Sequence, residues 1–433
     1  MKKLLFALLA LTAIISYTSC TPTVDDVYDK AYDQRKAENL ADIKSTLESA
    51  KNGWVMYIYG NQSLGGYNLL LKFHNDSVVA SSELNKVDTI SAPSHYQVGY
   101  SAGPILSFDE YNSIIHQFSD PVNQKYGTNG KGFEGDLEYR VQSYSADSIV
   151  LLGKKHENKI VMLPLAESTS WKSYLEKVKE VDDSMFTSNY DFVINGKDTI
   201  HARRSNRVLN YTVLDKDSQK VVNTIGYCIT DKGMRLYEPI SLDGQQITGF
   251  TYQPNSDIYT DVANSSVTLK KRIMNPNALL VDGTWYIDLA EAGAFPSNQW
   301  KIARSEMLAQ GDSLLMGCLG TYSTEFAFTF ALGNADTGYY LAALNFDYKL
   351  IGKDEISMTF NGYGDALGNG LQFLNGSYGV DALIAPFGYK KTRTFKVETD
   401  DLKRPSYMIL TDKSNRRNKM KLVSNTVYFP LQK

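Results

Sequence analysis

The segment FDEYNSIIHQFSDP, Phe108 to Pro121, is the one stretch of the sequence where Tyr, Asn, His and Asp gather. On a short helix, Asn112 and His116 would share a face, and Asp120 would lie one turn further along. A histidine beside a carboxylate can act as a general base, and together with Tyr111 these groups could line a ligand cleft. We therefore hypothesise a ligand-binding site formed by these four residues.

The same segment also fits a structural interpretation. Phe108, Ile115 and Phe118 would pack into a core, while the polar residues cap the helix and its exit at Pro121. We favour this interpretation. The sequence places no nucleophile beside the histidine, so catalysis has no second partner here.

A second set of candidate binding residues lies near the C-terminus. The Gly- and Asn-rich strings NGYGDALGNGLQF and NGSYGVDALIAPFGY fall between Asn361 and Tyr389, and they are typical of long irregular loops. Loops on a rigid β scaffold are where binding residues collect. We predict Tyr363, Tyr378 and Tyr389 as ligand-binding residues, with Phe387 beside them. Flexible hairpin tips account for the Gly and Asn residues equally well, and this is the interpretation we favour.

The histidines restrict enzymatic and metal chemistry. The chain has five, and none follows His201, so the C-terminal half cannot form a Ser-His-Asp arrangement by itself. No two lie three or four residues apart, so no helix presents a paired-histidine metal face. GTNGKGFEG from Gly127 lacks the end of a phosphate loop, and DKDSQK from Asp215 lacks the glycine of a calcium loop. We predict no catalytic residue, no metal and no cofactor.

Composition excludes one class of partner and leaves others open. The formal net charge is -3 and no Lys/Arg cluster is large enough to follow a phosphate backbone, so we predict no nucleic-acid partner. The densest basic stretch, Lys413 to Lys419, falls where a hairpin turn is expected. The 29 Tyr suit half-buried strand positions, which is the interpretation we favour, and also surfaces that bind sugars or peptides.

Cys20 ends a predicted leader. Two lysines precede the apolar run Leu4 to Ile15, which is too short to span a bilayer and is typical of a signal peptide. Ser19 before the cysteine resembles a bacterial lipoprotein processing box, although Tyr17 departs from that pattern. We predict lipid attachment at Cys20. The acidic residues that follow resemble a signal for the outer face of the outer membrane.

Cys228 and Cys318 are the only other cysteines. They allow at most one bridge, and they are too few for a zinc site. Free cysteine behaves as a small apolar residue, so we favour two buried thiols.

The hydrophobic period locates the elements that must position these residues. Val24 to Lys51 and Ser168 to Phe186 carry apolar residues at helical spacing, and Asn52-Gly53 ends the first helix. Most other runs alternate with period two and are linked by short turns at Asn75-Asp76, Ala146-Asp147 and Glu157-Asn158. The pattern predicts a mainly β fold of two, or alternatively three, antiparallel β-barrel or β-sandwich domains, with a short N-terminal helix and one connecting helix.

Pro276 between two asparagines marks our preferred domain boundary. GWVMYIYG from Gly53 and TWYIDL from Thr284 also open a weak internal repeat, although strand geometry alone can produce such echoes. The predicted organisation is a signal peptide at 1–19, a lipid tether and helix at 20–52, an N-terminal β region at 53–275 with an alternative further boundary near 166–188, and a C-terminal β domain at 276–433.

Several strings between Gly53 and Leu165 carry a family resemblance. They are GWVMYIYG, GGYNLLLKF, GPILSFDEYNSIIHQFSDP, GDLEYRV and IVLLGKKHENKIVMLPL. In this order they resemble an uncharacterised Bacteroidota lipoprotein family, domain of unknown function 4302, and the likeness continues through MRLYEPI and ITGFTY. The resemblance implies an accessory role in outer-membrane nutrient uptake, beside TonB-dependent transporters of the starch-utilisation type. It supplies no catalytic residues.

These observations lead to one expected function and two alternatives. We expect a non-catalytic lipoprotein on the cell surface that is anchored to the outer membrane and binds a glycan, a peptide or a partner protein. The first alternative is a structural or interaction subunit of a transporter complex. The least favoured is a hydrolase, which requires His95 or His116 within ~3 Å of a Ser, Asp or Glu in a cleft.

Overall fold

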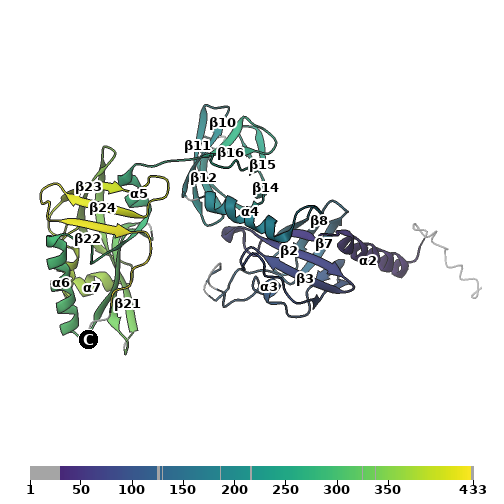
Figure 1. The fold of residues 1–433 in the computed structure, drawn as a ribbon, viewed down its shortest axis with the longest axis horizontal. Helices are drawn as coiled ribbons and strands as arrows, with labels where there is room; N and C mark the ends of the chain where they lie inside the picture. The colour runs from purple at the N-terminus through teal and green to yellow at the C-terminus, as the bar shows by residue number, and fades with distance from the viewer. Residues whose placement is uncertain are drawn as a thin grey trace, which may run out of the picture. The chain divides into compact units, whose positions relative to one another are not determined.

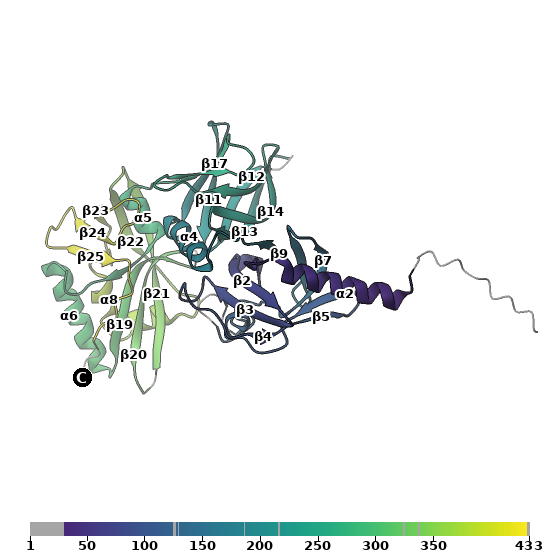
Figure 2. The same ribbon diagram turned by 45° about the vertical axis from the view of Figure 1, so that its right-hand side comes forward.

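The computed structural model describes residues 30–123, 127–128, 130–185, 187–214, 217–323, 325–336 and 338–430 (Figures 1 and 2). The fold is 44% strand and 19% helix, which confirms the predicted mainly β class. The predicted signal peptide and Cys20 lie outside the described residues. The chain divides into two compact units, Met1–Asp182 with Ser205–Asn210 and Asn223–Tyr252, and Asp183–Arg204 with Tyr211–Val222 and Gln253–Lys433.

The first described helix, α2 (Tyr32–Ser49), falls within the predicted N-terminal helical segment. Ile43 and Leu47 are its buried residues, as expected for an amphipathic helix against a sheet. The indole of Trp54 donates a 2.8 Å hydrogen bond to the carbonyl of Leu47, which ties the helix end to the strand that follows. Gly53 adopts a φ of 80° after the helix, so the predicted stop at Asn52-Gly53 is confirmed.

The first sheet has nine antiparallel strands in the order β4-β3-β2-β1-β9-β8-β7-β6-β5. Because β1 pairs with both β2 and β9, the meander curls back on its first strand. A 3-10 turn, η1 (Gln62–Leu64), and a short helix, α3 (Ser113–His116), interrupt it. The strands are β1 (Trp54–Ile58), β2 (Tyr67–His74), β3 (Ser77–Ser82), β4 (Ser94–His95), β5 (Gln97–Tyr100), β6 (Pro104–Ser107), β7 (Glu138–Tyr144), β8 (Ile149–Gly153) and β9 (Lys159–Pro164).

The predicted hairpin turns of this sheet are confirmed. Asn75 and Asp76 join β2 to β3 with φ values of 47° and 61°, the left-handed backbone that a two-residue hairpin turn needs. Glu157 has a φ of 57° between β8 and β9. Ala146 and Asp147 fall between the paired ends of β7 and β8.

The predicted second helix is α4 (Trp171–Ser184). Leu175 and Val178 are buried on one face, as the spacing predicted. The Ser170 hydroxyl accepts a hydrogen bond from the backbone N–H of Ser173 at 3.1 Å, which confirms the expected cap.

The strands after α4 close into an eight-stranded barrel in chain order. Its first strand, β10, pairs with both β11 and β17. The strands are β10 (Asn189–Ile194), β11 (Asp198–Ser205), β12 (Val208–Leu214), β13 (Lys220–Thr230), β14 (Gly233–Leu242), β15 (Gln245–Thr251), β16 (Ile258–Asp261) and β17 (Val267–Lys271).

A further eight-stranded barrel, here called the third barrel, closes by pairing β18 with β19 and β25. The basic stretch Lys413 to Lys419 joins β24 to β25, as expected of a hairpin turn. Its elements are α5 (Pro276–Asp282), β18 (Thr284–Ile287), α6 (Ala294–Ala309), β19 (Ser313–Tyr322), β20 (Glu325–Asn334), β21 (Gly338–Ile351), β22 (Glu355–Gly364), α7 (Asn369–Asn375), α8 (Val380–Ile384), β23 (Arg393–Thr399), β24 (Tyr407–Asp412) and β25 (Lys419–Val423).

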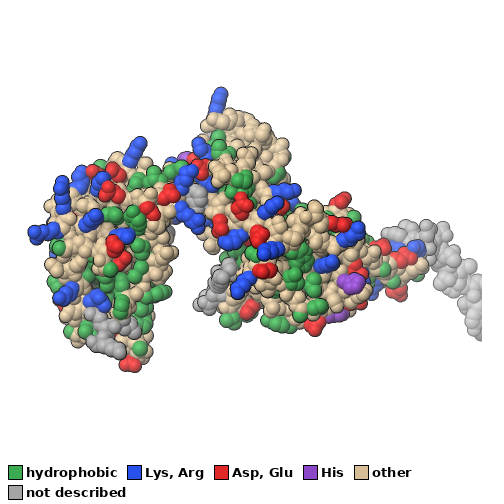
Figure 3. Space-filling model, viewed as in Figure 1, with side chains coloured by type: hydrophobic (Ala, Val, Ile, Leu, Met, Phe, Trp, Pro, Cys, Tyr) green, Lys and Arg blue, Asp and Glu red, His purple; other side chains and the backbone are tan. Residues whose placement is uncertain are grey.

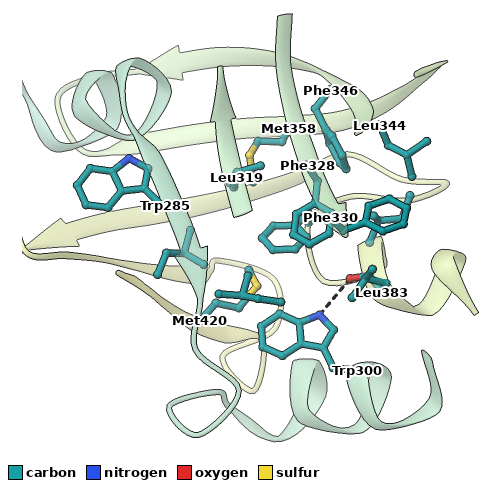
Figure 4. Close-up of a cluster of buried hydrophobic side chains, with 14 of the residues drawn as sticks. Trp285, Trp300, Leu319, Phe328, Phe330, Leu344, Phe346, Met358, Leu383 and Met420 are labelled. Atoms are coloured by element: carbon teal, nitrogen blue, oxygen red, sulfur yellow. Dashed lines mark hydrogen bonds between the residues drawn. The ribbon is translucent and has the colours of Figure 1, made fainter. Parts of the chain in front are cut away.

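Aromatic and aliphatic side chains fill the third barrel (Figure 4). Phe328 and Phe330 project into it from β20, and Trp300 joins them from α6. The Trp300 indole donates a 3.0 Å hydrogen bond to the carbonyl of Leu383 in α8, so α6 and α8 are fixed to each other at the core.

The prediction of irregular loops between Asn361 and Tyr389 is wrong for two segments, which form α7 and α8. Gly368 and Gly379, with φ values of 77° and 65°, precede these helices and turn the chain into them. Each helix then buries an apolar face, which gives it the tertiary support that a short helix needs. The Gly-rich composition marks helix boundaries here.

The first sheet and the third barrel begin in the same way. Trp285 in β18 donates a hydrogen bond to the carbonyl of Leu279 in the preceding helix α5, as Trp54 does to Leu47 in α2. In both cases the strand that carries the tryptophan pairs with the second and the last strand of its sheet. The two strings that open the predicted repeat, GWVMYIYG and TWYIDL, therefore occupy matching positions in their sheets.

Cys228 and Cys318 are free and buried, as favoured from the sequence. Burial raises the pKa of the Cys228 thiol and raises that of Cys318 to about 11. Among the described residues, no helix is long and apolar enough to cross a membrane. Within the same residues, no three His, Cys, Asp or Glu side chains gather as metal ligands.

Candidate ligand-binding surface

Asn112, the centre of the first predicted cluster, is the N-cap of α3. Its side-chain oxygen accepts hydrogen bonds from the backbone N–H groups of Ile114 and Ile115 at 3.0 and 3.3 Å. Its amide nitrogen donates to the hydroxyls of Ser91 and Ser94 at 2.9 and 3.0 Å. Asn112 is buried, and both its amide oxygen and its amide nitrogen form hydrogen bonds within the protein. Its role is therefore structural, as a helix cap.

His116 and Tyr111 are brought together. Their ring centroids lie 5.0 Å apart, and Tyr111 is 75% exposed. Burial lowers the pKa of His116, and its hydrogen bond to the Asn112 backbone opposes that shift without reversing it. The lowered pKa favours the neutral imidazole, and Tyr111 offers an accessible ring beside it.

Asp120 belongs to a turn of its own. Its carboxylate accepts a 2.9 Å hydrogen bond from the backbone N–H of Val122, the geometry of a side chain that closes a turn after a helix. The structure thus assembles two of the four predicted residues, and it places the other two as caps.

A groove of about 470 Å³ lies beside this segment, and Ser119 of the segment is one of its lining residues. The Asp136 carboxylate accepts hydrogen bonds from the backbone N–H groups of Lys155 and His156 at 3.1 and 3.2 Å. Lys154 and Glu138 pair at 2.8 Å. The lining side chains thus carry both signs of charge, in Ser119, Gly135, Asp136, Leu137, Glu138, Lys154 and Lys155.

Two histidine–aspartate pairs lie on the surface. His95 Nδ1 is 2.6 Å from Asp109 Oδ1, and His201 Nδ1 is 2.6 Å from Asp191 Oδ1. The His95 and Asp109 side chains are 49% and 42% exposed, and neither residue lines the groove described above. His95 therefore meets the distance criterion for a base while lying open to solvent.

The exposed tyrosines concentrate on the third barrel. Among the described residues, β21 and β22 together carry four exposed tyrosines, Tyr339, Tyr340, Tyr348 and Tyr363. The others are Tyr111, Tyr428 and the edge-on pair of Tyr32 and Tyr100, whose ring centroids lie 6.5 Å apart. Figure 3 shows hydrophobic side chains, tyrosines included, over the part of this barrel where Figure 1 labels β21.

One end of β21 forms an aromatic cluster with α7, here called the α7 cluster: Tyr340, Phe373 and Tyr378. Phe373 meets Tyr378 edge-on with centroids 5.0 Å apart, and Tyr340 with centroids 6.4 Å apart. Phe373 is buried, Tyr378 is partly buried and Tyr340 is 50% exposed. The cluster thus has a fixed base and an accessible outer edge.

The chain that leads into α7 is held against β21 by Asp365. Its carboxylate accepts hydrogen bonds from the backbone N–H groups of Ala343 and Gly370 at 3.0 and 2.8 Å. Burial opposes ionisation of Asp365, but these backbone donors outweigh it and lower its pKa. This loop presents Leu367, 84% exposed, and Tyr363, 70% exposed, lies at the end of β22 just before it. An ordered loop therefore presents its side chains next to the α7 cluster.

The predicted tyrosines of this region divide. Tyr378 joins the α7 cluster and Tyr363 lies at the end of β22, whereas Tyr389 packs partly buried against Phe360, with ring centroids 5.9 Å apart. The sequence analysis missed Tyr340. Two consecutive tyrosines in one strand are a usable signal, because alternation sends adjacent side chains to opposite faces.

The comparisons with known proteins identify a family. A family model described as Domain of unknown function (DUF4302) matches residues 24–254, just over half of the chain. The chain belongs to this family. The resemblance to DUF4302 in the sequence is thereby confirmed, and the family description names no activity. No curated protein matches the chain.

Solved structures give only distant likenesses. The beta subunit of DNA polymerase from Streptococcus pyogenes matches at 9% identity over 90% of this chain and 98% of that chain, with a TM-score of 0.14. The DNA polymerase III beta subunit from Bartonella birtlesii matches at 11% identity over 90% and 97%, with the same TM-score of 0.14. The DNA polymerase sliding clamp from Pseudomonas aeruginosa matches at 10% identity over 92% and 98%, with a TM-score of 0.13. We infer no role from likenesses this low.

Proposed function

We propose that this DUF4302 protein is a non-catalytic lipoprotein of the bacterial outer membrane that binds a glycan at the cell surface in support of nutrient uptake. The predicted leader and Cys20 support the anchored location. The observation that carries the binding role is the α7 cluster with Tyr363 and Leu367 beside it. Tyrosine rings that are fixed at their base and open at their edge suit the apolar faces of sugar rings.

Polar side chains on the same strands and helix support a glycan as the ligand. Asn361 accepts a hydrogen bond from the Tyr363 backbone and donates one of 3.1 Å to Asp347, and both side chains lie near the surface. Asn369 donates to the Leu341 carbonyl at 3.0 Å at the start of α7. A small number of polar groups around an apolar surface is enough to fix the orientation of a bound small molecule.

The experiment is a binding screen of the full chain against neutral polysaccharides by affinity gel electrophoresis, with amylopectin, xylan and galactomannan as probes. The proposal expects retardation by at least one of them. Retardation by none would count against a glycan ligand, and co-purification of a transporter from intact outer membranes in equal amounts would then favour the alternative below.

An interaction subunit of a transporter complex is the second candidate. It is favoured by the aliphatic side chain in the loop before α7, since Leu367 is 84% exposed. Exposed apolar groups around aromatic residues are also typical of protein interfaces. A TonB-dependent transporter is the partner that this candidate proposes.

A further inference from the structure

A small cavity in the third barrel lies apart from the tyrosines of the α7 cluster. It has a volume of about 190 Å³ and is lined by Leu289, Ser297, Trp300, Lys301 and Arg304. Four of these residues lie on α6 at intervals of three or four, so they share one face of the helix. We call this cavity the α6 pocket.

The charge of the α6 pocket has one sign. Lys301 and Arg304 are its two ionisable lining residues, and no lining residue is acidic. The acidic residues next to Leu289 in the chain bind elsewhere: Asp288 accepts a hydrogen bond from the backbone N–H of Ala290 at 3.0 Å, and Glu291 lies 3.6 Å from Lys421. Two cations are thus left without a carboxylate in the pocket wall.

The hydrogen bonding of Arg304 is incomplete. Its Nη2 donates a 3.3 Å hydrogen bond to the carbonyl of Pro430. Its Nε–H is buried and has no partner among the described residues. A guanidinium carries five donors in a planar fork that matches a carboxylate, and an unmade hydrogen bond of a buried charged group is costly. An anionic acceptor would complete this site.

The floor of the α6 pocket is apolar and rigid. Trp300 is 1% exposed and is held by its hydrogen bond to Leu383 (Figure 4). Leu289 lies beside it in the pocket wall, and the Ser297 hydroxyl donates to the carbonyl of Ala292 at 3.0 Å. Sulfate and phosphate prefer a cradle of polar donors on all sides. The apolar floor instead suits an anion attached to a carbon skeleton.

We propose that the α6 pocket binds a carboxylate carried by a small organic group. Lys301 and Arg304 pair with the carboxylate, and Trp300 and Leu289 contact its carbon skeleton. An acidic sugar and an acidic amino-acid residue share this chemistry. The proposal stands independently of glycan binding at the α7 cluster, because the two sites have no residue in common.

Isothermal titration calorimetry of the full chain distinguishes an acidic sugar from an acidic amino-acid residue as the source of the carboxylate. The probes are D-galacturonate with D-galactose as its neutral counterpart, N-acetylglutamate with N-acetylglutamine, and sodium sulfate. We expect one carboxylate to bind and its neutral counterpart not to bind. Equal affinity for both members of each pair, or binding of sulfate alone, would overturn the proposal.

Variants place the binding in the α6 pocket. Lys301→Gln and Arg304→Gln should each weaken carboxylate binding by at least tenfold, whereas Lys353→Gln, an exposed lysine on the same barrel outside the pocket, should not. Lys301 is exposed, so its replacement tests the pocket even if Arg304→Gln disturbs folding. Carboxylate binding that survives Lys301→Gln would contradict the assignment, while retardation by neutral polysaccharides should be the same in all three variants.

Discussion

Arg207 and Glu83 form a two-pronged ion pair although their side chains are only 6% and 7% exposed. Arg207 Nη1 lies 2.9 Å from Glu83 Oε1, and Nη2 lies 2.7 Å from Oε2. Burial works against the charged guanidinium, but Glu83 and Asp182 outweigh it and raise the pKa of Arg207. The pair joins the end of β3 to the residue before β12.

Breaking this buried pair should destabilise the chain strongly. Glu83→Gln removes the buried carboxylate and leaves Arg207 only the 43% exposed Asp182, so the free energy of unfolding in urea should fall by up to about 3–5 kcal/mol. The exposed pair of Lys396 and Glu398 is the control, and Glu398→Gln should cost less than about 1 kcal/mol. If the two variants lost similar amounts of unfolding free energy, the buried Arg207 pair would stabilise the chain no more than an exposed pair does.

Asp412 should give the third barrel an acid-dependent stability. It is fully buried and pairs with Arg393 at 2.5 Å. Burial opposes its ionisation, but hydrogen bonds from Ser414 and Asn418, together with Arg393, outweigh it and lower its pKa below the ordinary value of 3.8. A lowered pKa stabilises the fold above the unfolded-state pKa, and this stabilisation is lost as the pH falls through the folded-state pKa.

Urea unfolding of the wild type and Asp412→Asn at pH 7 and at about pH 3 measures this effect. The wild type should be more stable at pH 7, because Asp412→Asn leaves Arg393 without its carboxylate. The difference should shrink at the lower pH, because Asp412 of the unfolded chain, with its ordinary pKa of 3.8, binds a proton there more readily than Asp412 of the folded chain. A difference that is the same at both pH values would exclude this aspartate as the source.

The two buried cysteines should resist thiol reagents in the folded chain. Burial raises the pKa of Cys318 to about 11 and raises that of Cys228 well above its ordinary value, so neither is a thiolate at pH 8. In a Cys20→Ser variant, DTNB should react slowly in buffer and release two equivalents rapidly in urea. Rapid reaction of either thiol in buffer would place it at the surface.

Membrane attachment should depend on Cys20. In the producing bacterium, Cys20→Ser should move the protein from the membrane fraction to the soluble periplasmic fraction, because the attached lipid is the proposed anchor. Cys318→Ser is the matched control and should stay in the membrane fraction. If the Cys20→Ser protein remained in the membrane fraction, lipid attachment at Cys20 could not be the anchor.

Periodicity predicted the fold well because strands and amphipathic helices are set by local alternation of apolar residues. Trp54 and Asn75-Asp76 lie where that alternation and turn chemistry placed them. The helix α6 (Ala294–Ala309) was not predicted. α7 and α8 were also missed, because they are short and depend on packing against the barrel, which a sequence pattern does not contain. The glycines at the ends of these two helices also made their sequences resemble loops.

The candidate site was less predictable for a related reason. Asn112 and Asp120 cap local backbone, and the same residue types could equally have faced a ligand. Tyr340 and Tyr378 are 38 positions apart in sequence and meet only through Phe373, so no local pattern joins them. Side chains that face solvent carry no periodic signal of their own.

Glycan affinity of the tyrosine variants tests the central proposal most directly. Gel retardation by amylopectin, xylan and galactomannan is measured for the wild type, Tyr340→Ala, Tyr363→Ala and Tyr32→Ala, the last being an exposed tyrosine of α2. The account predicts that a polysaccharide that retards the wild type binds Tyr340→Ala and Tyr363→Ala at least tenfold more weakly, a loss of about 1.4 kcal/mol, and binds Tyr32→Ala unchanged. Equal retardation of all four proteins, or of none, would contradict it.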